Sequence, residues 1–305
     1  MFKARKLSYY VRGRVGKDKK VIRLVDNVSI NVDEGKIVAI YGDRYSGKYF
    51  LLRMLTGLIK PTSGEIRFRD IDILSLKKKD LMMLRRRVQT YFMDPINIFG
   101  FKSVEHHLKW LQSVLGGDYQ KIVKEVLSKY GIELEDVRNR SPNLPIYKLY
   151  LLYVSSGLLA NPELLILENP TALIEYRYRG DIHRFIKDLR DDHGISILLT
   201  TSDVELVKEI PDYIYVMYRG RIIEEGFRDD IISEPLHPYT KKILLDKSIH
   251  DISDYRMLGG ESVSIYNWSI CPYSQECPYY MDECNQDIEL FESGNRRVRC
   301  ILYKT

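Results

Sequence analysis

The feature that most constrains the fold is a glycine-rich loop between a short apolar run and a helix. Residues Lys36–Tyr41 (KIVAIY) form a short run that is apolar after the lysine and rich in β-branched side chains, which predicts a buried strand. The loop Gly42–Lys48 (GDRYSGK) follows, and Tyr49–Leu58 predicts a helix that ends near Gly57. The G-x-x-x-x-G-K spacing between a strand and a helix is typical of a loop that binds phosphate through backbone N–H groups and its lysine.

A magnesium ligand normally follows the lysine of such a loop as Ser or Thr, whereas this chain has Tyr49. A phenol on a rigid ring is a poor replacement for that short hydroxyl, so magnesium binding stays an open question. An ordinary glycine-rich turn is the alternative, but it explains neither the lysine nor the context. We expect a nucleotide to contact Gly42, Asp43, Arg44, Tyr45, Ser46, Gly47, Lys48, Tyr49 and Phe50.

Strands and helices alternate along the rest of the chain. Strands are predicted within Val21–Val32, at Gly64–Phe68, and at the continuous apolar runs Leu164–Leu167 and Ile195–Thr200. Continuous apolar strands that alternate with helices indicate a parallel sheet covered on both faces. Helical periodicity from Val104 to Gly131 predicts a small helical subdomain. The fold class is therefore α/β.

Composition and charge describe an ordinary globular chain. Of its 305 residues, 45% are hydrophobic and 29% are charged, which excludes a disordered or fibrous protein. The formal net charge of +5 is too mild an excess to indicate nucleic acid as a partner. No apolar N-terminal stretch predicts a secretory signal, and no apolar run reaches the roughly 18 residues of a membrane span. We expect an intracellular protein.

Further segments carry a family pattern in chain order. They are Gly35–Gly42, Thr56–Glu65, Gln89–Pro95, Asn161–Thr171, Val216–Gly226 and Leu236–Thr240 (LHPYT). With these segments the chain resembles the nucleotide-binding subunits of ATP-binding cassette (ABC) transporters, in the dipeptide/oligopeptide importer branch.

The resemblance covers nearly the whole chain. It implies an ABC-type P-loop NTPase core with a helical subdomain, an antiparallel β subdomain and a cysteine-rich C-terminal extension. The nucleotide-binding domain would span residues 1–245, with the helical subdomain at about 96–160, and the extension would span 246–305.

Within the family pattern, four functional positions carry unexpected residues. The catalytic glutamate falls on Asn169, whose amide cannot act as a general base. The preceding acidic position holds Glu168 in place of Asp, so a metal contact would be displaced. The Q-loop glutamine falls on Met93 and the switch histidine falls on Ser202. No catalytic residue of the family is intact in this chain.

The family signature Leu-Ser-Gly-Gly-Gln is also replaced. Its positions fall on Leu144, Pro145, Ile146, Tyr147 and Lys148. Glycines there let the γ-phosphate of a partner's nucleotide approach backbone N–H groups, whereas proline removes a donor and the next two side chains add bulk. This signature would face the nucleotide of a partner whose site is expected to be competent. Hydrolysis there tolerates it, or the partner's site is slow, or other residues compensate, and the sequence does not choose among the three.

Together these departures predict that the chain's own site hydrolyses ATP poorly or not at all. ATP binding is still expected, because the loop glycines and Lys48 remain. Tyr10 is our candidate for stacking on adenine, although Tyr9 or Val11 fits the family register as well and either tyrosine could simply pack in a strand. We interpret the chain as the degenerate half of a heterodimeric ATPase pair in an importer of di- or oligopeptides or oligosaccharides.

The resemblance also implies partners and a location. They are a second ABC ATPase subunit with a competent site, two membrane permease subunits and an extracellular substrate-binding protein, at the cytoplasmic face of the membrane. The helical subdomain and the loop Met93–Phe101 would receive the permeases. The alternative is a soluble cassette-fold scaffold or iron–sulfur regulator that joins no transporter.

All cysteines of the chain lie near its C-terminal end. They are Cys271, Cys277, Cys284 and Cys300, with the spacing C-x5-C-x6-C-x15-C. Four thiolates can surround an iron–sulfur cluster or a zinc ion, although zinc sites normally use paired C-x2–4-C knuckles. The resemblance implies a structural 4Fe-4S cluster, since some peptide-importer subunits carry one on this pattern. Zinc, and free or disulfide-paired cysteines, are the alternatives.

Overall fold

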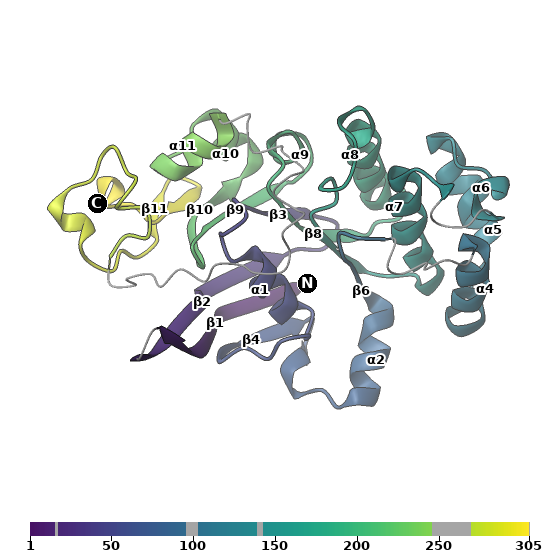
Figure 1. Cartoon of the computed structure of the whole chain (residues 1–305), viewed down its shortest axis with the longest axis horizontal. Helices are drawn as coiled ribbons and strands as arrows, with labels where there is room; N and C mark the ends of the chain where they lie inside the picture. Colours follow the sequence, from purple (N-terminus) through teal and green to yellow (C-terminus); the bar gives the residue numbers. More distant parts are fainter. Residues whose placement is uncertain (16–17, 96–102, 139–142, 246–269, 305) are drawn as a thin grey trace. The chain divides into compact units, whose positions relative to one another are not determined.

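The computed structural model describes residues 1–15, 18–95, 103–138, 143–245 and 270–304 (Figure 1). The described chain forms two compact units, one made of residues 1–75 with 200–305 and the other of residues 76–199. The loop Met93–Phe101 that is expected to receive permeases therefore lies partly outside the described residues, and residues 246–269 lie wholly outside them. Among the described residues, no helix is long and apolar enough to cross a membrane.

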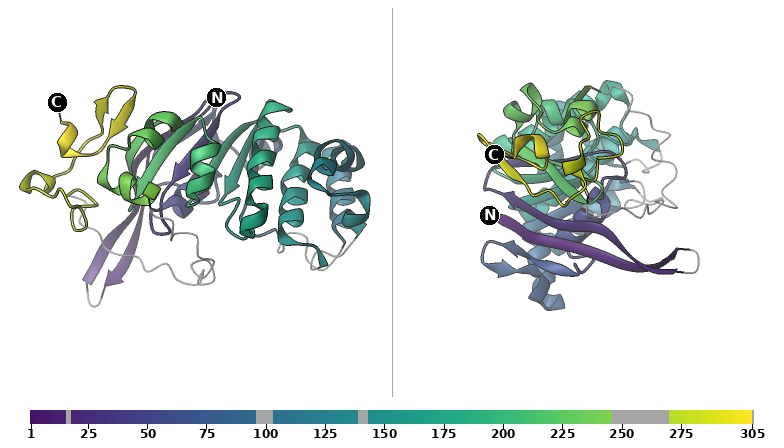
Figure 2. Two further views of the ribbon diagram at one scale, coloured as in Figure 1. Left: turned by 90° about the horizontal axis from the view of Figure 1, so that it is seen from above. Right: turned by 90° about the vertical axis from the view of Figure 1, so that its left-hand side faces the viewer.

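The first unit contains an antiparallel sheet in the order β2-β1-β4-β5. Its strands are β1 (Phe2–Val15), β2 (Asp18–Val32), β4 (Ser63–Phe68) and β5 (Ile71–Asp72). Figure 2 shows β1 and β2 as a long twisted ribbon. The pairing of β1 with β2 shifts register between Leu7 and Tyr9 and again between Tyr9 and Tyr10. Such irregularities change which sheet face a side chain occupies, so alternation alone does not predict the orientation of these tyrosines.

A second set of strands in this unit follows the order β11-β12-β10-β9-β3. They are β3 (Ile37–Tyr41), β9 (Tyr213–Tyr218), β10 (Arg221–Phe227), β11 (Phe291–Ser293) and β12 (Arg296–Val298). β3 and β9 are parallel, whereas β9–β10, β10–β12 and β11–β12 are antiparallel. The helices of the unit are α1 (Lys48–Leu55), η1 (Ile73–Ser75), α9 (Val204–Glu209), α10 (Arg228–Ser233), α11 (Pro238–Leu245), η8 (Asp282–Cys284) and η9 (Ile301–Tyr303).

One buried cluster joins the strands of this unit to its C-terminal residues. Tyr41 at the end of β3 and Val216 in β9 pack in the same core as Ile243 of α11, Cys271 and Ile288. The hydroxyl of Tyr41 donates a hydrogen bond of 2.7 Å to the carbonyl of Ile243. The C-terminal residues thus share a core with the strand that leads into the glycine-rich loop.

The second unit contains parallel strands and most of the helices. Its strands are β6 (Val88–Tyr91) and β7 (Leu164–Glu168), with β8 (Ser196–Thr201) ending at the boundary. Its helices are α2 (Lys78–Arg87), α4 (Val104–Leu115), α5 (Tyr119–Ile122), η2 (Val123–Leu127), η3 (Ser128–Tyr130), α6 (Leu134–Arg138), α7 (Ile146–Ser155), η5 (Ser156–Ala160) and α8 (Tyr176–Asp191). The strands predicted from continuous apolar runs and the predicted helical stretch are confirmed, and every residue of β7 and β8 is buried.

Candidate nucleotide-binding site

The glycine-rich loop, named the P-loop here for residues 42–48, joins β3 to α1 as predicted. A Cβ atom on Gly42 would lie 2.3 Å from the carbonyl oxygen of Met217, so only glycine fits there. Gly47 has a φ of +96°, and a Cβ there would lie 2.9 Å from the carbonyl oxygen of Leu24. The amide of Gly220 donates to the carbonyl of Ser46 at 2.7 Å. Neighbouring backbone therefore holds the loop tightly, which keeps its N–H groups in one arrangement.

Lys48 begins α1 and turns back into the P-loop. Its ammonium donates to the carbonyl oxygens of Gly42 at 2.7 Å and Asp43 at 2.6 Å, and to the Ser46 hydroxyl at 3.3 Å. The residue is only 5% exposed, so its positive charge lies inside the curve of the loop. A phosphate group is the natural partner for a cation and backbone N–H groups placed in this way.

Tyr49 occupies the position where a short hydroxyl would bind magnesium. Its ring is 38% exposed, and the guanidinium of Arg53 lies 3.3 Å from the ring centre. The ring also meets Phe50 edge-on, with 5.2 Å between ring centres. The side chain therefore packs along α1, and the position offers no aliphatic hydroxyl for a metal ion.

Two tyrosines in the middle of β1, Tyr9 and Tyr10, are candidates for stacking on adenine, and they have different surroundings. The Tyr10 hydroxyl donates to Asp26 at 3.0 Å, and the guanidinium of Arg23 lies 5.3 Å from its ring centre. The Tyr9 ring centre lies 6.0 Å from that of Phe50, which is two residues beyond Lys48. Tyr9 is thus next to the helix that follows the P-loop, and the role of Tyr10 stays a prediction.

Ser202 lies between β8 and α9, in the same unit as the P-loop. The adjacent Thr201 carbonyl accepts a hydrogen bond of 3.2 Å from the Gly42 amide. On the other side, Asp203 caps α9 by accepting from the amides of Glu205 and Leu206. The structure therefore places Ser202 next to a residue that bonds to the first residue of the P-loop, and its assignment to the switch position stays a prediction.

Met93, Glu168 and Asn169 come together at one edge in the second unit. β6 and β7 are parallel with Tyr91 opposite Leu167, so all three residues follow the carboxyl ends of neighbouring strands. Glu168 is 8% exposed, and Asn169 has a φ of +41°, a conformation that asparagine tolerates better than most residues. The Asn169 Oδ1 atom is buried and accepts no hydrogen bond within the described part of the chain.

The signature positions form the start of α7. Pro145 precedes the helix, and no side chain caps its N-terminus. The ring of Tyr147 stacks on that of Tyr178, with 3.9 Å between centres and 15° between planes, and Lys148 forms an ion pair of 3.1 Å with Asp136. The helix start therefore presents a proline and an aromatic pair where glycine amides would approach a phosphate.

The cysteines are all free thiols that line one small pocket, with Cys271, Cys284 and Cys300 buried and Cys277 half-buried. Burial, and then the neighbouring thiols, raise the pKa of Cys271 to about 11. Among the described residues, no group of three or more His, Cys, Asp or Glu side chains is arranged to hold a metal ion. The geometry of these residues therefore gives no support to a zinc ion or to an iron–sulfur cluster.

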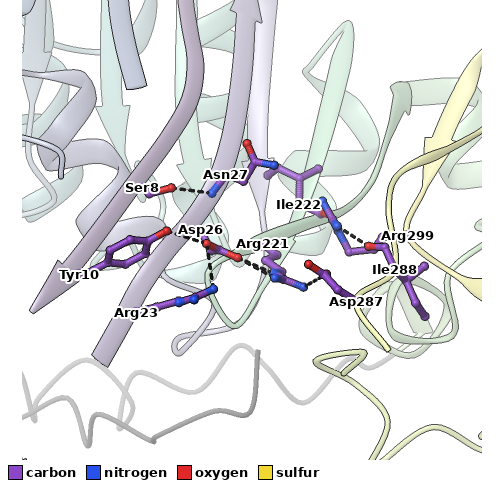
Figure 3. Close-up of polar contacts among 10 residues, drawn as sticks. All are labelled: Ser8, Tyr10, Arg23, Asp26, Asn27, Arg221, Ile222, Asp287, Ile288 and Arg299. Atoms are coloured by element: carbon purple, nitrogen blue, oxygen red, sulfur yellow. Dashed lines mark hydrogen bonds and ion pairs between the residues drawn. The ribbon is translucent and has the colours of Figure 1, made fainter. Parts of the chain in front are cut away.

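Sequence analysis missed a buried charge network in the first unit (Figure 3). Asp26 of β2 accepts two hydrogen bonds from Arg221 of β10, at 2.9 and 2.7 Å. Arg221 also donates to Asp287 at 2.6 Å, and Arg299 donates to the carbonyl of Ile222 at 3.0 Å. Burial and then the charge of Arg221 lower the pKa of Arg299 to about 10. Asp26 is 195 residues from Arg221 in the sequence, and Arg221 is 66 residues from Asp287, so no local pattern indicates that these charges meet.

Comparisons with known proteins match two parts of the chain. A family model described as "ABC transporter" matches residues 25–172, and one described as "Oligopeptide/dipeptide transporter, C-terminal region" matches residues 223–284. The methionine import ATP-binding protein MetN of Carboxydothermus hydrogenoformans is 30% identical over 229 residues, which cover 74% of this chain and 67% of that protein.

Two further relatives match over nearly their whole length. The oligopeptide transport ATP-binding protein AppD of Bacillus subtilis is 28% identical, covering 94% of this chain and 93% of AppD. The dipeptide transport ATP-binding protein DppF of Escherichia coli is 25% identical, covering 97% of this chain and 91% of DppF. Among solved structures, cbiO1 of Clostridium perfringens, part of the ABC transporter complex cbiONQ, superposes with a TM-score of 0.65. It is 24% identical, over 76% of this chain and 90% of cbiO1, which shows that the fold is shared.

Proposed function

Because this chain belongs to the ABC transporter family, we propose that it is the ATP-binding subunit of an importer of dipeptides or oligopeptides. The observation that carries the proposal is the order of the two matched regions, residues 25–172 and then 223–284. Relatives with oligopeptide or dipeptide transport in their names match both parts of the chain. In this proposal residues 1–245 are the nucleotide-binding domain, about 96–160 its helical subdomain, and 246–305 a cysteine-rich extension.

ATP binding is supported by the P-loop geometry. Tight backbone packing at Gly42 and Gly47 and the buried ammonium of Lys48 suit a triphosphate. Tyr9 is the better adenine-stacking candidate, because it contacts Phe50, whereas the ring of Tyr10 already carries a guanidinium on its face. Neither tyrosine is needed for the phosphate contacts.

We infer that this site binds ATP without hydrolysing it. The amide of Asn169 cannot accept the proton of an attacking water, and the hydroxyl of Ser202 lacks the basicity of a histidine. Met93 offers only a weak thioether acceptor where a glutamine would contact water or metal, and Tyr49 offers no aliphatic hydroxyl. Residues with four separate roles in hydrolysis are replaced, and together these replacements argue against ATP turnover more strongly than any single one does.

A hydrolysis-deficient subunit needs a partner that supplies turnover. We propose a heterodimer with a second ABC ATPase subunit whose site is competent, assembled with two permeases and a substrate-binding protein at the cytoplasmic face of the membrane. The start of α7, with Pro145 and the Tyr147–Tyr178 stack, would meet the partner's nucleotide. Hydrolysis at that site must therefore proceed without the usual glycine amides.

We propose further that the four cysteines hold a structural 4Fe-4S cluster. Support comes from the four thiols lining one pocket and from their spacing in the sequence. No three of these cysteines are close enough together to bind one metal ion in the structure. The proposal therefore requires that the four thiolates move to bind the irons of a cluster, which is larger than a single ion. Such a core would join the residues around Cys271 to those around Cys300.

Co-purification from membranes tests the transporter assignment. The tagged full chain should be recovered from detergent-solubilised membranes with two permease subunits and a second ATPase subunit. A Lys48→Ala variant should be recovered with the same partners, because the assembly does not depend on this chain's phosphate contacts. Recovery of the chain only from the soluble fraction, without a permease, would instead favour a scaffold or regulator that joins no transporter.

A further inference from the structure

The hydroxyl of Tyr239 lies against the P-loop. Tyr239 is the fourth residue of the LHPYT segment, sits in the first turn of α11 and is 2% exposed. Its hydroxyl accepts a hydrogen bond of 2.9 Å from the backbone amide of Asp43. The Asp43 carboxylate accepts another of 2.9 Å from the amide of Tyr45. Two successive bonds therefore fix the first half of the P-loop, and one of them comes from a side chain almost 200 residues away in the sequence (196 positions).

The position of Tyr239 does not depend on the P-loop. The buried carboxylate of Glu224 accepts hydrogen bonds from the amides of Leu236 at 2.8 Å and His237 at 2.9 Å, which anchors the start of α11 to β10. His237 Nδ1 accepts from the Tyr239 amide at 3.1 Å. The tyrosine is therefore presented to the loop by a backbone that other bonds already hold.

The cysteine-containing residues pack around the same ring. The Tyr239 ring centre lies 4.3 Å from that of Tyr218 and 5.6 Å from that of Tyr273, which is two residues after Cys271. The Tyr218 hydroxyl donates to Glu276 at 3.0 Å. The C-terminal residues thus restrict the ring that bonds to the P-loop.

We propose that Tyr239 is a positioning residue for nucleotide binding, which holds the Asp43 amide so that the P-loop keeps its phosphate-binding shape. This inference rests on the proposed ATP binding. A loop that is already ordered loses less conformational entropy when it binds phosphate. Without the hydroxyl, the part-buried Asp43 amide must find another acceptor, and the peptide between Gly42 and Asp43 is held only on its carbonyl side, by the hydrogen bond from the Lys48 ammonium to Gly42.

The variant Tyr239→Phe tests this role, because it removes the hydroxyl and keeps the ring packing. We expect the affinity for ATP, measured by equilibrium titration of the full chain, to fall about five-fold, the effect of one net hydrogen bond. Tyr213→Phe is the matched control, since its hydroxyl bonds to Glu225 at 3.3 Å in the same unit. The control should bind ATP within about two-fold of the unmodified chain.

Hydrogen exchange separates positioning from a general loss of structure. Without nucleotide, amides of residues 42–48 should exchange several-fold faster in Tyr239→Phe, while those of β9 keep their protection. Asp43→Asn weakens the hydrogen bond that the Asp43 carboxylate accepts from the Tyr45 amide, so it should also raise amide exchange in residues 42–48. It is the second variant to measure if Tyr239→Phe does not fold. Unchanged loop exchange in these variants, with unchanged ATP affinity, would overturn the inference. If the unmodified chain binds no ATP, the proposed function is wrong. The hydrogen exchange of residues 42–48 without nucleotide then still tests whether Tyr239 holds the P-loop.

Discussion

Replacement of Asp26 by asparagine should strongly destabilise the first unit. Asp26 is 6% exposed, Arg221 is 4% exposed, and their side chains make two hydrogen bonds of 2.9 and 2.7 Å. Arg299, 8% exposed, places a second guanidinium close enough to be affected by Arg221. Asp26→Asn keeps the shape but removes the buried negative charge beside Arg221, while the ion pair of Arg221 with Asp287, whose side chain is 62% exposed, remains.

The expected loss follows from the cost of an unpaired buried charge. Removing one partner of a buried ion pair costs about 3–5 kcal/mol, and the asparagine can still accept one hydrogen bond, so we expect about 3 kcal/mol. Asp287→Asn is the matched control, and it should cost less than about 1 kcal/mol because its carboxylate is exposed. Urea unfolding at pH 7, followed by circular dichroism, gives both values.

A double variant distinguishes charge from packing. In Asp26→Asn with Arg221→Met the cation that Asp26 paired is removed and only Arg299 remains buried, so we expect the chain to recover part of the free energy of unfolding lost in Asp26→Asn alone. A loss below about 1 kcal/mol in Asp26→Asn, or a double variant less stable than the single one, would refute the reasoning.

Two further predictions concern the C-terminal half. Burial and the charge of Arg299 lower the pKa of His237 from 6.5 to about 3, so below pH 6.5 the unfolded chain binds a proton that the folded chain excludes. His237 should therefore lower the free energy of unfolding by about 1.4 kcal/mol per pH unit as the pH drops from 6.5 toward 3. In His237→Asn, urea unfolding at several pH values should show a free energy of unfolding that no longer carries this contribution to its pH dependence. The anaerobically purified chain should absorb broadly near ~400 nm, and Cys284→Ser should lose the band; a colourless unmodified chain would contradict the cluster.

Local sequence patterns predicted the strands and the P-loop because their signals lie within a few residues. The runs at Leu164–Leu167 and Ile195–Thr200 are mostly apolar, and they form strands whose described residues are buried. The G-x-x-x-x-G-K spacing likewise requires glycine at positions where the structure leaves no room for a Cβ. The residues that form these strands and the P-loop are therefore the same residues that predict them.

Features that depend on distant residues were not predictable in this way. Asp26 and Arg221 are 195 residues apart, and neither belongs to a motif. The sequence favoured Tyr10 over Tyr9 for adenine stacking but could not show which sheet face either ring occupies, because register shifts in β1 change that face. The LHPYT segment was recognised as a family pattern, but nothing in its letters indicates that the Tyr239 hydroxyl bonds to Asp43.

The most direct test of the central claim measures ATP binding and phosphate release on the same purified chain, beside the Lys48→Ala variant. We expect the unmodified chain to bind ATP, the variant to bind it at least about ten-fold more weakly, and both to release phosphate at the rate of buffer alone. Phosphate release well above that rate, abolished by Lys48→Ala, would show that this site hydrolyses ATP and would contradict the role assigned to it.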